Sequence, residues 1–244
     1  MGLFVLGIWG YFHGPALISE VSHSFELAFA GAGFKLEDVV VEGRMRTDKG
    51  LILKKLGLTR GNPLLSINLA DAKTKLEELS WIKSVRVERR FPDTLFIRIS
   101  EKEPVALWVN QAKKTYLLDR DGEMVETEDA HKYKSLLVVS GHNAPKEIGK
   151  LLAILEKFPD LKSRVTAATH LRANRWDIRL DDSLDIKLPE KEADRALVYL
   201  LDLEKTHHLM EKKIMSIDLR LPGQMILRLT PEGAQEKSHT GKDA

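Results

Sequence analysis

The fold of this protein is decided by residues 76–104, which read LEELSWIKSVRVERRFPDTLFIRISEKEP. Val85 and Val87 alternate with polar residues on both sides, and a period of two is typical of a strand with one buried face. Residues 91–94 (FPDT) have the composition of a turn. The alternation resumes over residues 95–99, where leucine and isoleucine occupy every second position. This stretch therefore predicts the end of a helix followed by a hairpin of two strands, with one face of the hairpin in water.

The residues before the hairpin predict one strand and two helices. A run of valines that ends at Gly43 predicts the strand, and leucine-rich stretches with helical spacing follow it. The candidate N-caps are Thr47 or Asp48 for the first helix and Asn68 or Asp71 for the second. Gly57 is placed to end the first helix. The order strand, helix, helix, strand, strand predicts a small α+β domain over residues 34–103, with both helices on one face of a three-stranded sheet.

A second, larger pattern of strands occupies residues 104–230. Its expected strands are residues 105–109, 116–119, 124–125, 136–139, 165–171, 176–180, 184–188, 215–221 and 225–229. One expected helix begins at Pro145, and another covers residues 193–204. Asp119 and Gly122 bound a hairpin turn in which the glycine takes the left-handed conformation, because the further acidic ligands of a calcium loop are absent. These signals predict a mostly antiparallel β domain with two helices.

The two ends of the chain differ from this folded pattern. Residues 1–18 are mostly apolar, and the first basic residue of the chain is Lys35. The apolar run is shorter than the roughly 20 residues that cross a bilayer. We therefore expect part of a membrane anchor, apparently truncated, whose start and basic flank lie upstream; a buried helix of a soluble domain is the alternative. We expect residues 19–33 to be an amphipathic juxtamembrane connector and residues 231–244, which lack apolar periodicity, to be a disordered tail.

Composition and motifs argue against an enzyme. The 38 basic and 36 acidic residues are mixed along the chain and leave a net charge of +2, without the basic run that binds nucleic acid. The absence of cysteine excludes disulfides, thiolate metal sites and cysteine nucleophiles. His207 and His208 are adjacent and point about 100° apart on a helix, so they cannot bind one metal ion together. No zinc-protease, serine-hydrolase or phosphate-loop motif occurs. We expect no catalysis, no cofactor, no metal site, no nucleic-acid partner and no small-molecule substrate.

Several of these segments resemble one known family. The loop at residues 61–68 (GNPLLSIN) and the hairpin stretch quoted above are similar to a POTRA domain. Residues 97–108 (IRISEKEPVALW) resemble the version of that domain in the FtsQ/DivIB family of bacterial cell-division proteins. The blocks at residues 176–189 and 217–221 are similar to the second domain of that family. The resemblance covers nearly all of residues 1–230 and departs at the N-terminus, where the family's basic cytoplasmic tail and complete membrane span are not intact.

The resemblance implies a scaffold of the cell-division machinery. Such a protein crosses the bacterial inner membrane once, holds most of its chain in the periplasm and gathers at the division septum. Its partners are two small single-span coiled-coil division proteins, bound mainly by the second domain, and other divisome components that the POTRA domain contacts. The alternative is a POTRA-type chaperone module in outer-membrane protein assembly or secretion. Only 7% of the residues are aromatic and the second domain contains two expected helices, which disfavours this alternative.

The last expected strand is the candidate partner-binding site. A terminal strand often lies at a sheet edge, where unpaired N–H and C=O groups can bind a strand of another chain. The resemblance implies the same site, because the family's second domain binds its partners through this strand and the segment before it. The candidate residues are Arg220, Leu221, Gly223, Met225, Ile226, Leu227, Arg228, Leu229 and Thr230. The alternative is an ordinary closing hairpin in which Arg220 is a solvated side chain.

Overall fold

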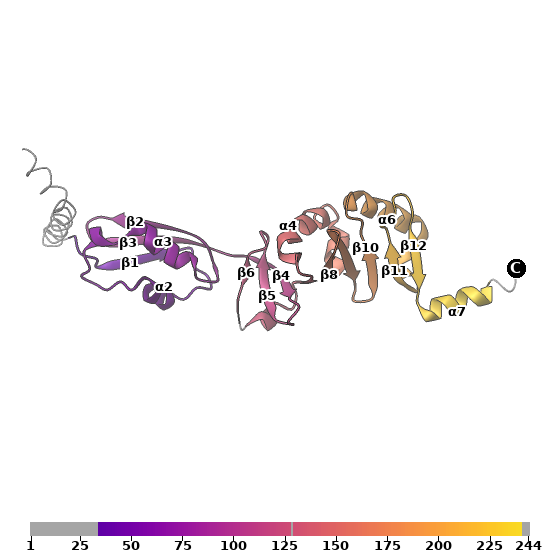
Figure 1. Cartoon of the computed structure of the whole chain (residues 1–244), viewed down its shortest axis with the longest axis horizontal. Coiled ribbons are helices and arrows are strands. Elements are labelled where there is room, and N and C mark those ends of the chain that lie inside the picture. Colours follow the sequence, from indigo (N-terminus) through magenta and orange to yellow (C-terminus); the bar gives the residue numbers. More distant parts are fainter. Residues whose placement is uncertain (1–33, 128, 241–244) are drawn as a thin grey trace, which may run out of the picture. The chain divides into compact units, whose positions relative to one another are not determined.

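A computed structural model describes residues 34–127 and 129–240 of the 244-residue chain (Figure 1). The expected membrane anchor and juxtamembrane connector, residues 1–18 and 19–33, lie outside the described residues. Within the described part, no helix has both the length and the apolar character needed to cross a bilayer. The chain divides into two compact units after Lys102, and each unit has its own hydrophobic core.

The first unit has the order of elements that the sequence predicts. It consists of β1 (Asp38–Glu42), α2 (Lys49–Leu56), the 3₁₀ turn η1 (Leu64–Ser66), α3 (Leu69–Glu77), β2 (Ile82–Arg90) and β3 (Thr94–Glu101). β3 lies in the centre of the sheet, antiparallel to β2 and parallel to β1. The predicted α+β class and the predicted hairpin are therefore confirmed for this unit.

Two of the four candidate caps begin the helices. The Asp48 carboxylate accepts a backbone N–H of the first turn of α2, and the Asn68 side chain accepts the N–H groups of Ala70 and Asp71 at the start of α3. Gly57 ends α2 with a φ of 66°, a conformation that glycine adopts without steric cost. Local capping thus sets where the helices begin, and the apolar residues between the caps cover the sheet.

One face of the sheet carries the core, and the other carries a buried aromatic ring. The core residues are Leu36, Ile52, Leu56, Leu64, Ile67, Ala72, Leu76, Ile82, Val85, Leu95, Ile97 and Ile99. Phe96 alternates with these core residues on β3 and yet is only 1% exposed. The guanidinium carbons of Arg90 and Arg98 lie 3.3 and 5.4 Å from the centre of the Phe96 ring. Arginine side chains therefore shield a ring that the helices do not cover.

A carboxylate at the end of β3 holds the loop that follows β1. The Glu101 oxygens accept the backbone N–H groups of Met45, Arg46 and Thr47 at 2.7–3.0 Å. Burial raises the pKa of Glu101, but these hydrogen bonds together outweigh burial, so its pKa lies below the ordinary value of 4.5. The loop backbone is thus held in place although the Met45 side chain is 82% exposed.

Glu101→Gln is expected to destabilise the first unit at neutral pH and to flatten its pH dependence. A carboxylate with a lowered folded-state pKa contributes stability above its unfolded pKa, and this contribution is lost as the pH falls through the folded pKa. Thermal unfolding of the whole chain between about pH 7 and pH 3 measures the effect, and the wild type should lose stability below about pH 4.5. Glu88→Gln removes the same charge from β2 and serves as the control. Equal pH profiles for the wild type and Glu101→Gln would contradict this role.

The described residues of the second unit form one nine-stranded sheet. Its strands are β4 (Pro104–Val109), β5 (Thr115–Asp119), β6 (Met124–Val125), β7 (Leu137–Ser140), β8 (Val165–Leu171), β9 (Arg175–Leu180), β10 (Leu184–Lys187), β11 (Ile214–Asp218) and β12 (Ile226–Leu229). They lie in the order β12-β11-β10-β9-β8-β7-β4-β5-β6. Antiparallel pairs predominate, as predicted, but β4–β7, β7–β8 and β10–β11 are parallel, so the sheet is mixed.

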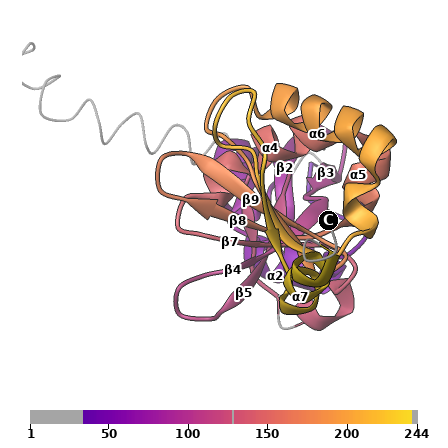
Figure 2. The same cartoon turned by 90° about the vertical axis from the view of Figure 1, so that its right-hand side faces the viewer.

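Three helices of this unit pack on one face of the sheet (Figure 2). They are α4 (Ala144–Leu155), α5 (Pro159–Arg164) and α6 (Ala193–His207), and the short 3₁₀ turns are η2 (Ala130–Tyr133) and η3 (Leu209–Glu211). The two predicted helices correspond to α4 and α6. The sequence prediction misses α5, because a helix of six residues has too few turns to show a periodic apolar stripe.

The last described segment differs from the disordered tail expected for residues 231–244. Helix α7 (Pro231–Thr240) follows β12 directly. The Thr230 hydroxyl accepts the Gly233 N–H at 3.2 Å, and Pro231 occupies the first turn, where its missing N–H costs nothing. The Thr230 cap and Pro231 therefore start a helix whose residues lack the apolar periodicity by which a helix is predicted from sequence.

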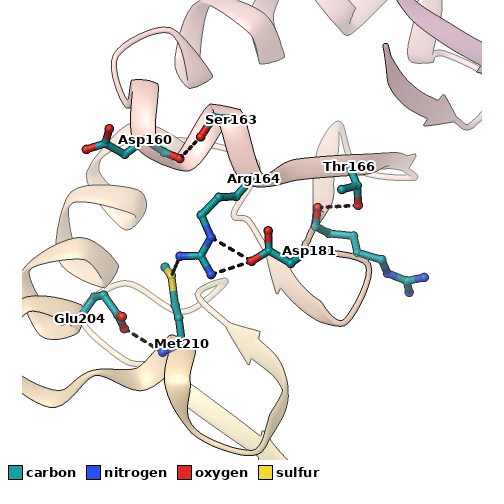
Figure 3. A network of polar contacts seen from close by, with 8 residues as sticks. Asp160, Ser163, Arg164, Thr166, Asp181, Glu204 and Met210 are labelled. Atoms are coloured by element: carbon teal, nitrogen blue, oxygen red, sulfur yellow. Dashed lines mark hydrogen bonds and ion pairs between the residues drawn. The ribbon is translucent and has the colours of Figure 1, made fainter. Parts of the chain in front are cut away.

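A polar network fixes the connection between α6 and β11 (Figure 3). Arg164, the last residue of α5, donates Nε and Nη2 to Asp181 Oδ2 at 2.9 and 2.7 Å and Nη1 to the Met210 sulfur at 3.3 Å. Glu204 of α6 accepts the Met210 N–H at 2.9 Å. The network joins α5, the β9–β10 turn, α6 and η3, and it therefore anchors the segment from which the last two strands begin.

Candidate partner-binding site

β12 is an edge strand of the nine-stranded sheet. It pairs antiparallel with β11 along residues 226–229. Among the described residues, no strand pairs with the other side of β12. Three of its four side chains are exposed. The backbone groups on this side can therefore pair with an extended segment of another chain.

The two faces of β12 differ in their side chains. Met225 and Leu229 pack against the helix-covered core, and Leu227 stands on the same face, opposite a buried residue of β11. Ile226 and Arg228 belong to the alternate set and point away from the helices, as the period of two requires. Ile226 is 55% exposed and Leu227 38% exposed, so an apolar edge remains open to solvent on both faces.

An apolar groove opens on the helix face beside the start of β12. It has a volume of about 260 Å³ and lies between α6 and the segment that joins β11 to β12. Tyr199 of α6 and Leu221 of the joining segment line it and are 39% and 52% exposed. Ala196, Leu219 and Pro222 contribute further apolar lining. The groove can accept apolar side chains of a segment that lies against β12.

Arg220 lies on the opposite face from this groove and is held by Asp218. The Arg220 Nε donates to both Asp218 oxygens at 2.8 and 3.0 Å, and its Nη2 donates to Oδ2 at 2.5 Å. The hydrogen bond from the Arg220 side chain is the largest cause that lowers the pKa of Asp218 below its ordinary value. Asp218 therefore orients Arg220, although the Arg220 side chain remains 42% exposed.

The ends of β12 are set by a tight turn and by α7. Gly223 has a φ of 70°, and the Gln224 N–H donates to the Leu221 carbonyl at 3.1 Å, which closes a tight turn. At the other end, the Thr230 N–H donates to the Lys213 carbonyl at 2.9 Å. The edge available to another strand therefore extends from the turn to Leu229.

The predicted site residues lie on one hairpin but not on one face. Gly223 belongs to the turn, and Thr230 starts α7. The sequence prediction misses two residues of this region. Tyr199 lines the groove, and Asp218 forms the ion pair that holds Arg220. Asp218 alternates with the apolar residues of its strand and could have been noticed as the neighbour of Arg220. Nothing in the sequence connects Tyr199 with the last strand, because more than twenty residues separate them.

Metal-binding side chains do not cluster among the described residues. These residues contain no group of three or more His, Cys, Asp or Glu side chains placed to hold a metal ion. Gly122 has a φ of 79°, and its N–H donates to the Asp119 carbonyl at 3.1 Å. The segment considered as a calcium loop is therefore the hairpin turn between β5 and β6 that the sequence predicts.

Comparisons with known proteins match both units. Residues 34–102 match the family described as POTRA domain, FtsQ-type, and residues 106–220 match Cell division protein FtsQ/DivIB, C-terminal. Cell division protein FtsQ of Rickettsia felis is 38% identical over 189 residues, which are 77% of this chain and 70% of that protein. Cell division protein FtsQ of Rhizobium meliloti is 30% identical over 225 residues, which are 92% of this chain and 72% of that protein.

Proposed function

This chain belongs to the FtsQ/DivIB family of bacterial cell division proteins, and from this premise we propose that it is a non-enzymatic scaffold of the division machinery. Its second unit binds other division proteins, partly by the addition of a strand to β12. The POTRA unit, residues 34–102, contacts further components.

The exposed edge of β12 is the observation that carries this proposal. A partner segment that pairs with β12 extends the sheet, and its affinity comes from backbone hydrogen bonds while the side chains give selectivity. Leu227 and Ile226, both partly exposed at the edge, and the groove beside α6 supply apolar area to bury. Arg220, fixed by Asp218, places an oriented guanidinium group in the segment that leads to β12.

The sequence supports the topology of this scaffold. The apolar residues 1–18 are proposed as part of a single membrane anchor, with the folded units in the periplasm. The proposed partners are small single-span coiled-coil division proteins. Their extended or helical segments beyond the membrane would meet the second unit on the same side of the bilayer.

A localisation experiment tests the division role. A fluorescent fusion of the chain is expected to gather at mid-cell, and depletion of the protein is expected to produce filamentous cells. A fusion that lacks residues 103–244 separates the contribution of the second unit from that of the first. Uniform fluorescence around the envelope together with normal division would overturn the proposal.

The alternative function, a POTRA-type chaperone module of outer-membrane protein assembly or secretion, is not favoured. The two family matches cover residues 34–102 and 106–220, one in each unit, and both name the division family. The full-length relatives are likewise division proteins.

A further inference from the structure

We propose that Arg228 selects the strand that pairs with β12, so that this strand carries a carboxylate opposite Arg228 and apolar side chains toward the groove beside α6. The inference rests on the proposed strand addition and states the chemistry of the segment that binds.

Arg228 is a cation without a partner among the described residues. Its side chain is exposed, and its neighbour across the ladder on β11 is Ser216, which is uncharged and buried. The structure gives Arg228 no hydrogen bond or ion pair with any residue of the described ranges, whereas Arg220 on the same face is paired with Asp218. Arg228 is therefore available to a carboxylate from outside the chain.

Arg228 belongs to a row of residues that lie directly opposite one another on neighbouring strands. This row shows which side chain an added strand should place opposite Arg228. From β9 to β12 this row reads Arg179, Asp185, Ser216 and Arg228. Arg179 and Asp185 neutralise each other through hydrogen bonds of 2.7 and 3.1 Å. Asp185 is two strands away from Arg228, about 9.6 Å in the sheet, and cannot also pair with it. A strand added beside β12 would extend this row by one residue. Because opposite charges directly across from each other stabilise strand pairing, a carboxylate is favoured at that position.

The other face of β12 requires a different side chain. Leu227 and Leu229 point toward the helices, and the groove between Tyr199 and Leu221 opens on that side. Because the side chains of a strand alternate, a segment with its carboxylate opposite Arg228 places the preceding and following residues on this apolar face. Apolar residues bury area there against Ala196, Leu219 and Pro222.

The edge therefore favours an alternating apolar and acidic strand over an alternating apolar and basic one. Both strands can offer their apolar face to the groove by a choice of register. They differ at Arg228, which attracts the acidic face and repels the basic face. Arg228 determines the specificity, and the backbone of β12 supplies affinity that both strands share.

Two fluorescent eight-residue peptides test this inference, one alternating valine with glutamate and one alternating valine with lysine. Their binding to the whole chain in mild detergent is measured by fluorescence anisotropy. The valine–glutamate peptide is expected to bind the wild type about fivefold more tightly than the valine–lysine peptide. Arg228→Glu is expected to reverse this order, and Arg228→Gln to remove the difference.

Arg86→Glu is the matched control, because it makes the same charge change on an exposed side chain of the first unit. It should leave the peptide preference unchanged, which separates a local contact from the effect of net charge. If both peptides bind equally well and Arg228→Glu changes neither, strand addition stands and the role of Arg228 is overturned. If neither peptide binds the wild type or any variant, the proposed strand addition itself is overturned.

Discussion

Leu227→Pro is expected to abolish binding of the division partners while the circular dichroism spectrum remains that of the wild type. Leu227 is an interior residue of the four-residue strand β12. Proline has no N–H group, and its ring disturbs the line of hydrogen bonds along an edge. Since strand addition draws its affinity from this backbone, one interrupted position in so short a strand removes most of the pairing. Co-purification of the proposed coiled-coil partners with the tagged chain measures the effect.

Two further proline variants control this experiment. Successive N–H groups of a strand point to opposite sides, so Ile226→Pro and Leu227→Pro remove groups of opposite direction. Loss of an N–H that bonds to β11 lowers the thermal midpoint, whereas loss of one on the free edge leaves it at the wild-type value. The variant with the unchanged midpoint is therefore the one that must lose partner binding. Met124→Pro lies on β6, the strand at the other end of the sheet, and should leave binding intact. Partner binding retained by both β12 variants would refute strand addition at this edge.

Gly122→Ala is expected to lower the free energy of unfolding of the second unit by more than about 3 kcal/mol. Gly122 has a φ of +79°, and a Cβ built there would lie 1.8 Å from the carbonyl oxygen of Pro145. The obstacle is the backbone at the start of α4, so a change of side-chain rotamer cannot relieve it. The β5–β6 turn must move away from α4, which opens the core that α4 covers. Urea unfolding of the whole chain, followed by circular dichroism, measures the loss.

Gly223→Ala is the control for this substitution. Gly223 has a φ of +70°, but nothing lies within 4 Å of the Cβ position. It therefore carries only the backbone cost of an alanine in the left-handed region, about 1 kcal/mol. Equal losses in the two variants would show that the close approach of Gly122 to Pro145 does not limit the stability of the unit.

The fold of the first unit could be predicted because its signals are local. The alternation around Val85 and Val87 defines a strand, and the side chains of Asp48 and Asn68 each satisfy N–H groups within three residues of themselves. Phe96 could not be predicted as a buried residue, because its burial depends on arginine side chains that lie over its ring. The parallel pairs of the second sheet could not be predicted either, since alternation gives the faces of a strand but not its neighbours.

The edge position of the last strand could be predicted, whereas the groove beside it and the pairing of its arginines could not. A last expected strand often lies at a sheet edge, and the structure has β12 at the edge of the sheet. The groove needs Tyr199 of α6, which only the tertiary fold brings to the hairpin. Whether an arginine is paired also depends on the neighbouring strands. Arg220 and Arg228 look alike in the sequence, yet the structure pairs Arg220 with Asp218 and leaves Arg228 beside Ser216.

The central place of β3 governs when the first unit can fold during synthesis. Its two neighbours, β1 and β2, are both made before it, and within this sheet β1 has no strand to pair with until residues 94–98 have emerged. The Glu101 carboxylate that secures the loop after β1 arrives later still. A nascent chain that ends before β3 therefore holds two amphipathic helices and two unpaired strands, β1 and β2, with apolar side chains open to proteases and to aggregation. The unit acquires its protection in one late step, when the last eight residues of its sheet enter between strands already present.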